Sequence, residues 1–308
     1  MQRTFVTLAD GRRIHAACIG RGSPTVLFEQ GGEASILNWQ QVQPAITALT
    51  RTCFYDRAGF GYSDPPPGQI TAVTVTDDTR AILAALHVEG PIVIVGHSIG
   101  GFYGTIYAQR FPGAVAGLVL VDPGFGGQVQ PRDQAQKDTW LRNIRPAEAH
   151  LLECADLARQ GRQHIGEEHG CIRYRPAKSP AEAAYLSYIV EHPYWYEAEY
   201  NQSRNYFIAD QGLSEDTQES QRVARPLGDM PLVVLTSEFT PMGAWMDEAL
   251  RRQFLGDWRA GHDRIAALST RGVSRIVPGS THFIQLSRPQ AVVDAITRVV
   301  EDVRRERR

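Results

Sequence analysis

The sequence predicts an α/β protein, in which a mainly parallel β-sheet is covered by helices on both faces and interrupted by a helical insertion. Short apolar runs alternate with helical patterns in a regular order along the chain. Two of these runs, 91–95 and 117–121, are almost continuously apolar, which is typical of strands buried on both faces of a parallel sheet. From about 123 to 229 the pattern is helical, is broken by prolines and gives no strand signal.

The first third of the chain predicts a hairpin and then alternating strands and helices. In order, the predicted elements are hairpin strands at 3–8 and 12–19, a strand at 25–29, a helix at 38–49, a strand at 52–56, a helix at 71–87 and a strand at 91–95. The hairpin follows from Asp10-Gly11, a tight-turn dipeptide between its strands. Pro24 and Gly31-Gly32 bound the strand that lies between them.

The remaining elements continue the same alternation on either side of the insertion. After residue 95 the chain turns sharply into a helix that ends near Phe111-Pro112, and a strand at 117–122 follows at once. Beyond the insertion, the predicted elements are a strand at 231–236, a long helical stretch, a strand at 272–277 and a helix from about 289 to 303. Such an order predicts parallel strands whose carboxyl ends meet at one edge of the sheet.

Composition and charge exclude several classes of function. Hydrophobic residues form 43% and charged residues 21% of the 308 residues, so we expect a globular protein with a sizeable core. The formal net charge of −2 offers no broad attraction to phosphate backbones or anionic lipids, so we expect no nucleic-acid or membrane partner. The N-terminal residues MQRTFVTLADG lack the apolar region of a targeting signal, and no apolar stretch approaches the length of a membrane-spanning helix. We therefore expect a cytoplasmic location.

The four cysteines, Cys18, Cys53, Cys154 and Cys171, show no C-x-x-C spacing. Neither a zinc site nor a disulfide framework follows from this pattern, so we expect buried or neutral thiols. Pairing of Cys154 with Cys171 is the alternative for an exported protein. The sequence gives no reason to expect a metal or another cofactor.

The segment Gly96-His97-Ser98-Ile99-Gly100-Gly101 is the most informative in the chain. It contains the pattern G-x-S-x-G between a predicted buried strand and a predicted helix, which is the context that a nucleophile elbow requires. The glycines permit a strained turn that exposes the Ser98 hydroxyl above the sheet. At a helix N-terminus, the same turn directs free N–H groups at developing negative charge.

A serine hydroxyl needs a base to accept its proton, and histidine is the usual choice. Among nine histidines, His282 follows the last predicted strand and precedes the final helix. This places it at the carboxyl edge of the sheet, where Ser98 also emerges. The side chain of His97 should point away from the Ser98 hydroxyl. The other histidines lie in helical or inserted segments and are expected to be surface or packing residues.

Together these motifs resemble those of the α/β-hydrolases that carry a helical cap. The motifs are Glu29-Gln30-Gly31-Gly32, the run 55–63 (YDRAGFGYS), the elbow at 96–101 and Ser280-Thr281-His282-Phe283. The resemblance implies a mostly parallel eight-stranded sheet with helices on both faces, a core formed by 1–122 and 230–308, and a cap formed by 123–229. It also implies an oxyanion hole made by the backbone N–H groups of Gly32 and Ile99. Many members have His-Gly where this chain has Gln30-Gly31, which should not matter for backbone donors.

The acid of the triad has two candidates. In most of the superfamily it follows the strand after the cap, where this chain has Glu238 and no aspartate. In some members, including zearalenone-type lactonases, it stands at the end of the strand that follows the elbow helix, and Asp122 occupies that place. Either choice keeps the order serine, acid, histidine. Asp122 is our first assignment because it needs no register shift, and Glu238 remains the alternative acid.

The resemblance implies a cofactor-free serine hydrolase that cleaves a carboxylic ester or lactone through an acyl-serine. Relatives such as epoxide hydrolases use an aspartate at the elbow, so Ser98 argues against their chemistry. An amide hydrolase of the proline-iminopeptidase type or a C–C hydrolase is the alternative enzyme, and Glu191, Glu197 and Glu199 are candidates for binding a free amino group. A small-molecule receptor that retains the triad is the alternative of another class.

The insertion is rich in aromatic residues between 185 and 207, namely Tyr185, Tyr188, Tyr194, Trp195, Tyr196, Tyr200, Tyr206 and Phe207. If they line the site, they predict a substrate with an apolar or aromatic group. If they form the core of the insertion itself, they carry no information about the substrate. The sequence leaves both interpretations open.

Overall fold

The computed structural model describes residues 4–32, 36–162, 171, 179–240 and 242–306. It contains an eight-stranded sheet in the order β1-β2-β4-β3-β5-β6-β7-β8. The strands are β1 (Phe5–Thr7), β2 (Arg13–Ile19), β3 (Val26–Glu29), β4 (Thr52–Tyr55), β5 (Ile92–His97), β6 (Val115–Val121), β7 (Leu232–Phe239) and β8 (Gly272–Thr281). β1 and β2 are antiparallel to their neighbours, and all the other pairs are parallel. The predicted α/β fold with a mostly parallel eight-stranded sheet is therefore confirmed.

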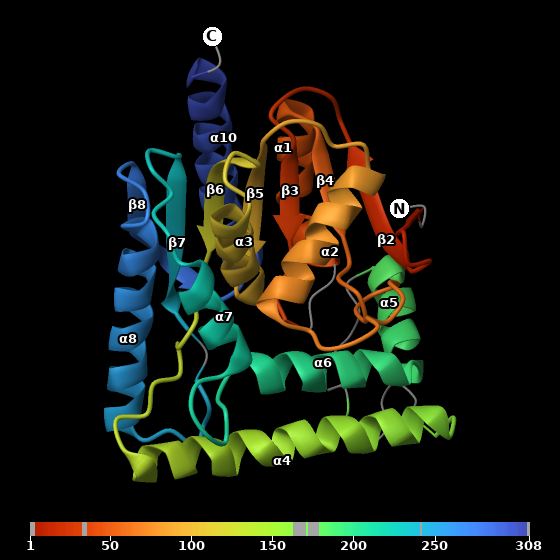
Figure 1. Ribbon diagram of the computed structural model, residues 1–308, viewed down its shortest axis with the longest axis vertical. Helices are drawn as coiled ribbons and strands as arrows, with labels where there is room; N and C mark the ends of the chain where they lie inside the picture. Colours follow the sequence, from red (N-terminus) through yellow and green to blue (C-terminus); the bar gives the residue numbers. More distant parts are fainter. Residues whose placement is uncertain (1–3, 33–35, 163–170, 172–178, 241, 307–308) are drawn as a thin grey trace.

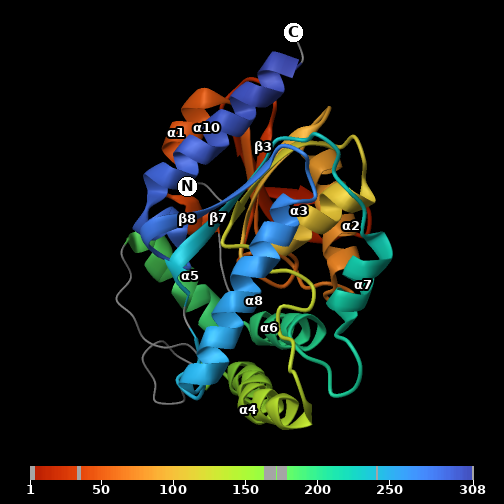
Figure 2. The ribbon, with the colours of Figure 1, turned by 90° about the vertical axis from the view of Figure 1, so that its left-hand side faces the viewer.

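Helices pack against both faces of this sheet (Figures 1 and 2). The helices are η1 (Ile36–Trp39), α1 (Gln43–Leu49), α2 (Ala72–Ala85), α3 (Ile99–Arg110), α4 (Gln134–Arg159), α5 (Pro180–Glu191), α6 (Pro193–Tyr206), α7 (Glu215–Val223), α8 (Glu248–Ala266), α9 (Ile284–Ser287) and α10 (Pro289–Glu306). α1 and α10 cover one face, and α2, α3 and α8 cover the other (Figure 2). The helix expected at 38–49 is instead a 3₁₀ turn followed by α1, since Pro44 suits only the first turn of a helix.

Two apolar layers flank the sheet, one on each side. Alternate strand residues point to opposite faces, so Ile94 of β5 joins the layer under α2, α3 and α8, whereas Val95 joins the layer under α1 and α10. α10 contributes an apolar stripe with helical spacing, made of Val292, Ala295, Ile296, Val299, Val300 and Val303. This packing on both faces explains why the sequences of β5 and β6 are almost continuously apolar.

The segment between β6 and β7 contains α4, α5, α6 and α7. α4 and α6 lie across the carboxyl edge of the sheet, with α6 nearer to the strands (Figure 1). α7 also contacts α2 and α3 of the helical layer. In the described part of this segment no strand forms, as expected. The division into a core of 1–122 and 230–308 and a cap of 123–229 stays a prediction.

The expectation of free thiols is wrong, because the structure contains disulfides between Cys18 and Cys53 and between Cys154 and Cys171. Cys18 and Cys53 are direct partners in the antiparallel pair of β2 and β4. Opposed residues of such a pair lie close enough for their side chains to bond. Residue spacing in the sequence does not reveal this register, which is why the pair was not expected.

Candidate active site

Ser98 stands at the sharp turn between β5 and α3. Its φ of 53° is in the region that residues other than glycine rarely adopt. The turn depends on its glycines, because a Cβ on Gly96 would lie 2.5 Å from the Gly100 carbonyl oxygen, and one on Gly100 would lie 2.2 Å from the Gln30 carbonyl oxygen. The sequence therefore folds here into the predicted strand-turn-helix elbow, with the Ser98 hydroxyl at the carboxyl edge of the sheet.

The structure brings Ser98, His282 and Asp122 together at this edge. His282 Nε2 lies 3.0 Å from Ser98 Oγ, and His282 Nδ1 lies 2.6 Å from Asp122 Oδ2. Asp122 directly follows β6, and His282 directly follows β8. Since the parallel strands end at the same edge, residues far apart in sequence form one continuous line of hydrogen bonds.

Asp122 is fully buried and accepts hydrogen bonds from several donors. Besides His282, these are the Ser237 backbone N–H at 2.8 Å, the Ser237 hydroxyl at 2.8 Å and Trp258 Nε1 at 3.2 Å. Burial raises the pKa of Asp122, but the hydrogen bond and charge interaction with His282, together with the Ser237 N–H, outweigh it and hold the pKa below its usual value. The carboxylate is therefore ionised at neutral pH.

Glu238, the other acid candidate, lies at the exposed end of β7. Its carboxylate accepts a hydrogen bond from the Gly279 backbone N–H at 2.5 Å. Of the two candidates, the structure thus brings Asp122 into contact with His282, and Glu238 instead joins the ends of β7 and β8. The geometry favours Asp122 as the partner of the imidazole.

Two further histidines support this arrangement, although sequence reasoning gave neither a role in the site. His97 is buried and points away from the Ser98 hydroxyl, as expected, because its Nε2–H donates to the His282 carbonyl oxygen at 3.0 Å. Burial, together with the nearby His282, lowers the pKa of His97 to about 3, so its ring stays neutral. His97 therefore fixes the backbone of His282 without adding charge.

His262, expected to be a surface or packing residue, is fully buried behind Asp122. Its Nε2–H donates to the Pro123 carbonyl oxygen at 2.8 Å, and Nδ1 accepts from the Thr236 hydroxyl at 2.6 Å. Burial lowers its pKa, which keeps the ring neutral. In the sequence, this position was indicated only by the spacing of four residues between Trp258 and His262, which places both on one face of α8.

A cavity of about 240 Å³ opens in front of Ser98. Gly32 and Ile99, the residues predicted to form the oxyanion hole, both line it beside Ser98 and His282. Ile99 is the first residue of α3, so its N–H has no acceptor within the helix. The two residues therefore stand where backbone donors are needed, and their role as an oxyanion hole stays a proposal.

The aromatic residues of the insertion divide between the site and the interior. Tyr206 and Phe207 line the cavity. Tyr185 and Tyr188 instead pack against Tyr62, with ring centroids 5.8 and 4.8 Å away. Most of the aromatic cluster thus belongs to the packing of the insertion, and only its C-terminal end faces the site.

An adjoining cavity of about 410 Å³ shares several lining residues with the first, namely Gln128, Glu199, Ser203, Phe207 and Phe254. Its other walls are largely apolar and include Trp140, Met242, Trp245 and Met246. Among the described residues that line either cavity there is no lysine or arginine. The described lining residues therefore offer no lysine or arginine to an anionic ligand, and they include the carboxylates of Glu148 and Glu199.

The three glutamates considered for binding an amino group do not converge. Glu191 is exposed at the end of α5, and Glu197 forms an ion pair with Arg159. Glu199 alone of the three lines the cavity. The structure therefore does not bring together the acidic cluster that an aminopeptidase of this kind would use.

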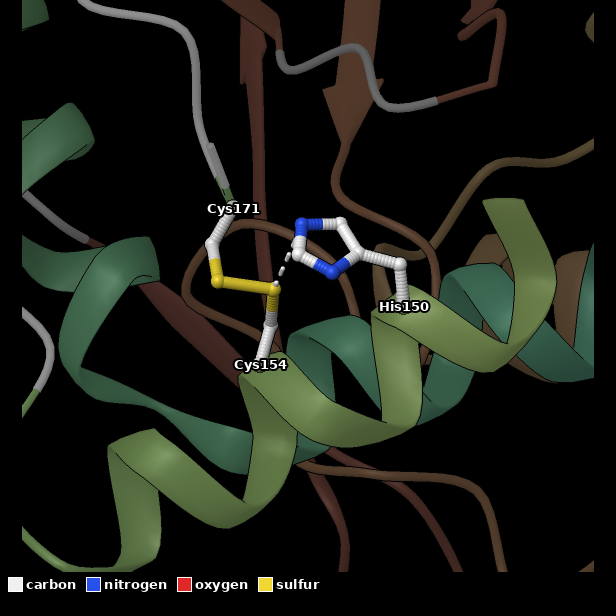
Figure 3. Close-up of side chains that lie close together, drawn as sticks. All are labelled: His150, Cys154 and Cys171. Carbon is white, nitrogen blue, oxygen red and sulfur yellow. Dashed lines mark hydrogen bonds between the residues drawn. A yellow bond between two sulfur atoms is a disulfide. The ribbon is translucent and has the colours of Figure 1, made fainter. Parts of the chain in front are cut away.

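One group of possible metal ligands lies away from this site, formed by His150, Cys154 and Cys171 (Figure 3). His150 and Cys154 are one turn apart on α4, and the His150 Nε2 lies 3.6 Å from the Cys154 sulfur. Both sulfurs are joined in a disulfide. Because thiolates are the metal-binding form of cysteine, this group has no thiolate ligand to offer while the disulfide is intact.

Comparison with known proteins places this chain in a family. The sequence profile described as alpha/beta hydrolase fold matches residues 24–251. The 2-hydroxy-6-oxo-2,4-heptadienoate hydrolase of Pseudomonas putida is 27% identical over 178 residues, which cover 57% of this chain and 63% of that protein. A thermophilic esterase from Thermogutta terrifontis, solved with malate bound, aligns over 98% of this chain and 99% of its own with a TM-score of 0.62. At 18% identity, this last likeness shows the fold alone.

Another relative corrects the expected location. An uncharacterized vacuolar membrane protein of Saccharomyces cerevisiae is 27% identical over 136 residues, which cover 38% of this chain and 21% of that protein. The expectation of a cytoplasmic location is thereby contradicted. In the described part of the chain no helix is both long and apolar enough to span a membrane. The chain spans less than a third of the length of the fungal relatives it matches. From the extent of the profile match and the shared fold, this chain belongs to the alpha/beta hydrolase fold family.

Proposed function

We propose that the protein is a serine hydrolase that cleaves a carboxylic ester or lactone through an acyl-serine intermediate. The observation that carries the proposal is the unbroken line from Ser98 Oγ through His282 to the ionised Asp122, with links of 3.0 and 2.6 Å. Neutral His282 with its proton on Nδ1, held by Asp122, presents a free lone pair on Nε2 to the serine hydroxyl. This is the arrangement that makes a serine nucleophilic at neutral pH.

In this mechanism Ser98 Oγ attacks the substrate carbonyl carbon while its proton moves to His282 Nε2. The carbonyl electron pair moves to oxygen, and the backbone N–H groups of Gly32 and Ile99 stabilise the resulting anion. Collapse of the tetrahedral intermediate breaks the bond to the leaving alcohol, which takes the proton from His282. Water then repeats the cycle on the acyl-serine and releases the acid.

The segment 123–229 acts as a cap in this proposal. It supplies Gln128, Glu199, Gln202, Ser203, Tyr206 and Phe207 to the cavity in front of Ser98. The adjoining apolar cavity and the lack of cationic lining residues in the described structure favour an uncharged substrate with an apolar acyl or alcohol group. Substrate choice therefore resides mainly in the inserted segment.

A C–C hydrolase is the second candidate, because the Pseudomonas putida relative bears the name of such an enzyme. That relative's named substrate is a carboxylate, whereas the cavity here has no lysine or arginine among its described lining residues. A panel that compares p-nitrophenyl esters, aryl lactones and a vinylogous 1,5-diketone acid separates the two candidates. Faster turnover of the diketone acid than of every ester and lactone would replace our first choice.

The test of the nucleophile is Ser98→Ala, with Ser274→Ala on β8 as a matched control. We expect Ser98→Ala to lose covalent labelling by a fluorophosphonate probe and p-nitrophenyl ester hydrolysis together, because the attacking oxygen is gone. Ser274→Ala should retain both. Labelling that persists in Ser98→Ala would refute the mechanism, and tight ligand binding by the wild type without multiple turnover would favour a receptor.

A further inference from the structure

Gln202 of α6 places a side-chain amide directly beside the candidate oxyanion hole. It is only 3% exposed and lines the cavity together with Gly32 and Ser98. A Cβ built on Gly32 would lie 3.3 Å from Gln202 Nε2, so the amide nitrogen is adjacent to the Gly32 backbone. This side chain comes from the inserted segment, whereas Gly32 follows β3.

The orientation of this amide is fixed by chemistry. Gln202 Oε1 accepts a hydrogen bond from Arg57 Nη2 at 3.2 Å. A guanidinium has donors and no acceptor, so the amide oxygen has to face Arg57 and the NH₂ group has to face away from it. A flipped amide would set two donors against each other.

Arg57 is itself held in place and is only 3% exposed. Its guanidinium pairs with Glu29 at 3.1 Å and donates to the Gly31 carbonyl oxygen at 2.5 Å and to the Gln30 carbonyl oxygen. One cation therefore fixes both the backbone that leads to Gly32 and the amide of Gln202. The two donors are aligned by the same buried group.

The NH₂ group of Gln202 has no acceptor among the residues that the structure describes. A donor at a cavity wall is satisfied by water, or by a ligand oxygen that replaces the water. The group borders the cavity in front of Ser98, where a substrate carbonyl would lie. An oxygen of a substrate bound there would lie beside this donor.

We propose that Gln202 is a catalytic residue whose Nε2–H donates a third hydrogen bond to the oxyanion, alongside the N–H groups of Gly32 and Ile99. The proposal rests on the serine hydrolase function proposed above. As Ser98 Oγ bonds to the carbonyl carbon and its proton passes to His282, the π electron pair becomes the oxyanion that Gln202 stabilises. The oxyanion hole is then complete only when α6 lies over the sheet.

The matched experiment compares Gln202→Glu with Gln128→Glu. Gln128 also lines the cavity, and its Oε1 accepts from the Tyr206 hydroxyl at 2.7 Å. Each glutamate keeps the acceptor for its partner and adds a negative charge to a residue that lines the cavity, but only Gln202 adjoins Gly32. We expect kcat for a p-nitrophenyl ester to fall about 10²- to 10³-fold or more in Gln202→Glu and less than about 10-fold in Gln128→Glu.

A neutral variant removes the effect of the added charge. We expect Gln202→Met to lower kcat about 10²-fold with little change in KM. It should also weaken the binding of an aryl boronic acid, which forms a tetrahedral anion on the serine, by a similar factor. Where Gln202→Met does not fold, Gln202→Glu still retains the acceptor for Arg57. Equal losses in the two glutamate variants, or a kcat within 3-fold of wild type in Gln202→Met, would overturn the role of Gln202. Activity in Ser98→Ala would overturn the proposed function itself.

Discussion

Replacement of Asp122 by asparagine should abolish most hydrolysis, because the donors around this carboxylate decide which way an amide has to face. Oδ1 accepts from the Ser237 backbone N–H and from Trp258 Nε1, neither of which is able to accept in return. Oδ2 accepts from His282 and from the Ser237 hydroxyl, and both of these groups are able to accept instead. The asparagine NH₂ is therefore driven to the Oδ2 position, against His282.

This orientation forces His282 into the wrong tautomer. With NH₂ facing Nδ1, the imidazole proton moves to Nε2, which is then unable to accept the proton of Ser98. The opposite amide orientation sets NH₂ against two N–H donors, at a cost of about 1–3 kcal/mol for each unmade bond. A difference of about 2–6 kcal/mol leaves the active tautomer populated at roughly 1 part in 30 to 1 part in 2 × 10⁴. We expect kcat to fall by roughly 10³-fold.

The assay is steady-state hydrolysis of a p-nitrophenyl ester at pH 7.5, with Glu238→Gln as the matched control. Glu238 lies at the exposed end of β7, so we expect its amide variant to stay within a few-fold of wild type. Thermal unfolding of each variant checks that the fold is retained. Activity of Asp122→Asn within 10-fold of wild type would refute this reasoning, as would an equal loss in Glu238→Gln.

Two further predictions concern stability. Burial raises the pKa of Asp216 to about 7 in the folded protein. Its contribution to the free energy of unfolding is therefore full below the unfolded-state pKa near 3.8 and is lost as pH rises through 7. Asp216→Asn keeps an acceptor for the Ala72 N–H but does not titrate, so it should remove this pH-dependent loss, which is at most about 4 kcal/mol. Urea unfolding of both proteins from pH 4 to pH 8 tests this, and parallel wild-type and variant profiles would contradict it. Replacing Cys154 and Cys171 by alanine should lower the free energy of unfolding by about 3 kcal/mol, because a cross-link 17 residues apart is lost. An unchanged urea midpoint would count against this.

The elbow shows how much of the site a local pattern predicts. The apolar run at 91–95 predicts a buried strand, and the glycines around Ser98 predict the strained turn that follows it. The glycine contacts that shape this turn come from residues close in sequence and from residues that follow the two neighbouring strands. His282 and Asp122 were predictable for a related reason, since residues that directly follow parallel strands gather at one edge.

The supporting residues were not predictable in this way. His262 reaches Pro123 from α8, and Trp258 reaches Asp122 from the same helix, over more than a hundred residues of sequence. The Cys18–Cys53 disulfide depends on strand register, and the cavity walls depend on how α4 and α6 lie across the sheet. Apart from the four-residue spacing of Trp258 and His262, none of these contacts leaves a periodic signal in the chain.

By itself, the sequence determined the order of strands and helices, the elbow, and the identity of the nucleophile and base candidates, because each depends on hydrophobic periodicity or on turn chemistry within a few residues. Only the tertiary structure decided between Asp122 and Glu238 as the partner of His282, and only it separated the aromatic residues that line the site from those that pack inside the insertion. It also placed Gln202 beside Gly32 through Arg57. These choices rest on distances between segments far apart in the chain, which are fixed when the helices pack onto the sheet.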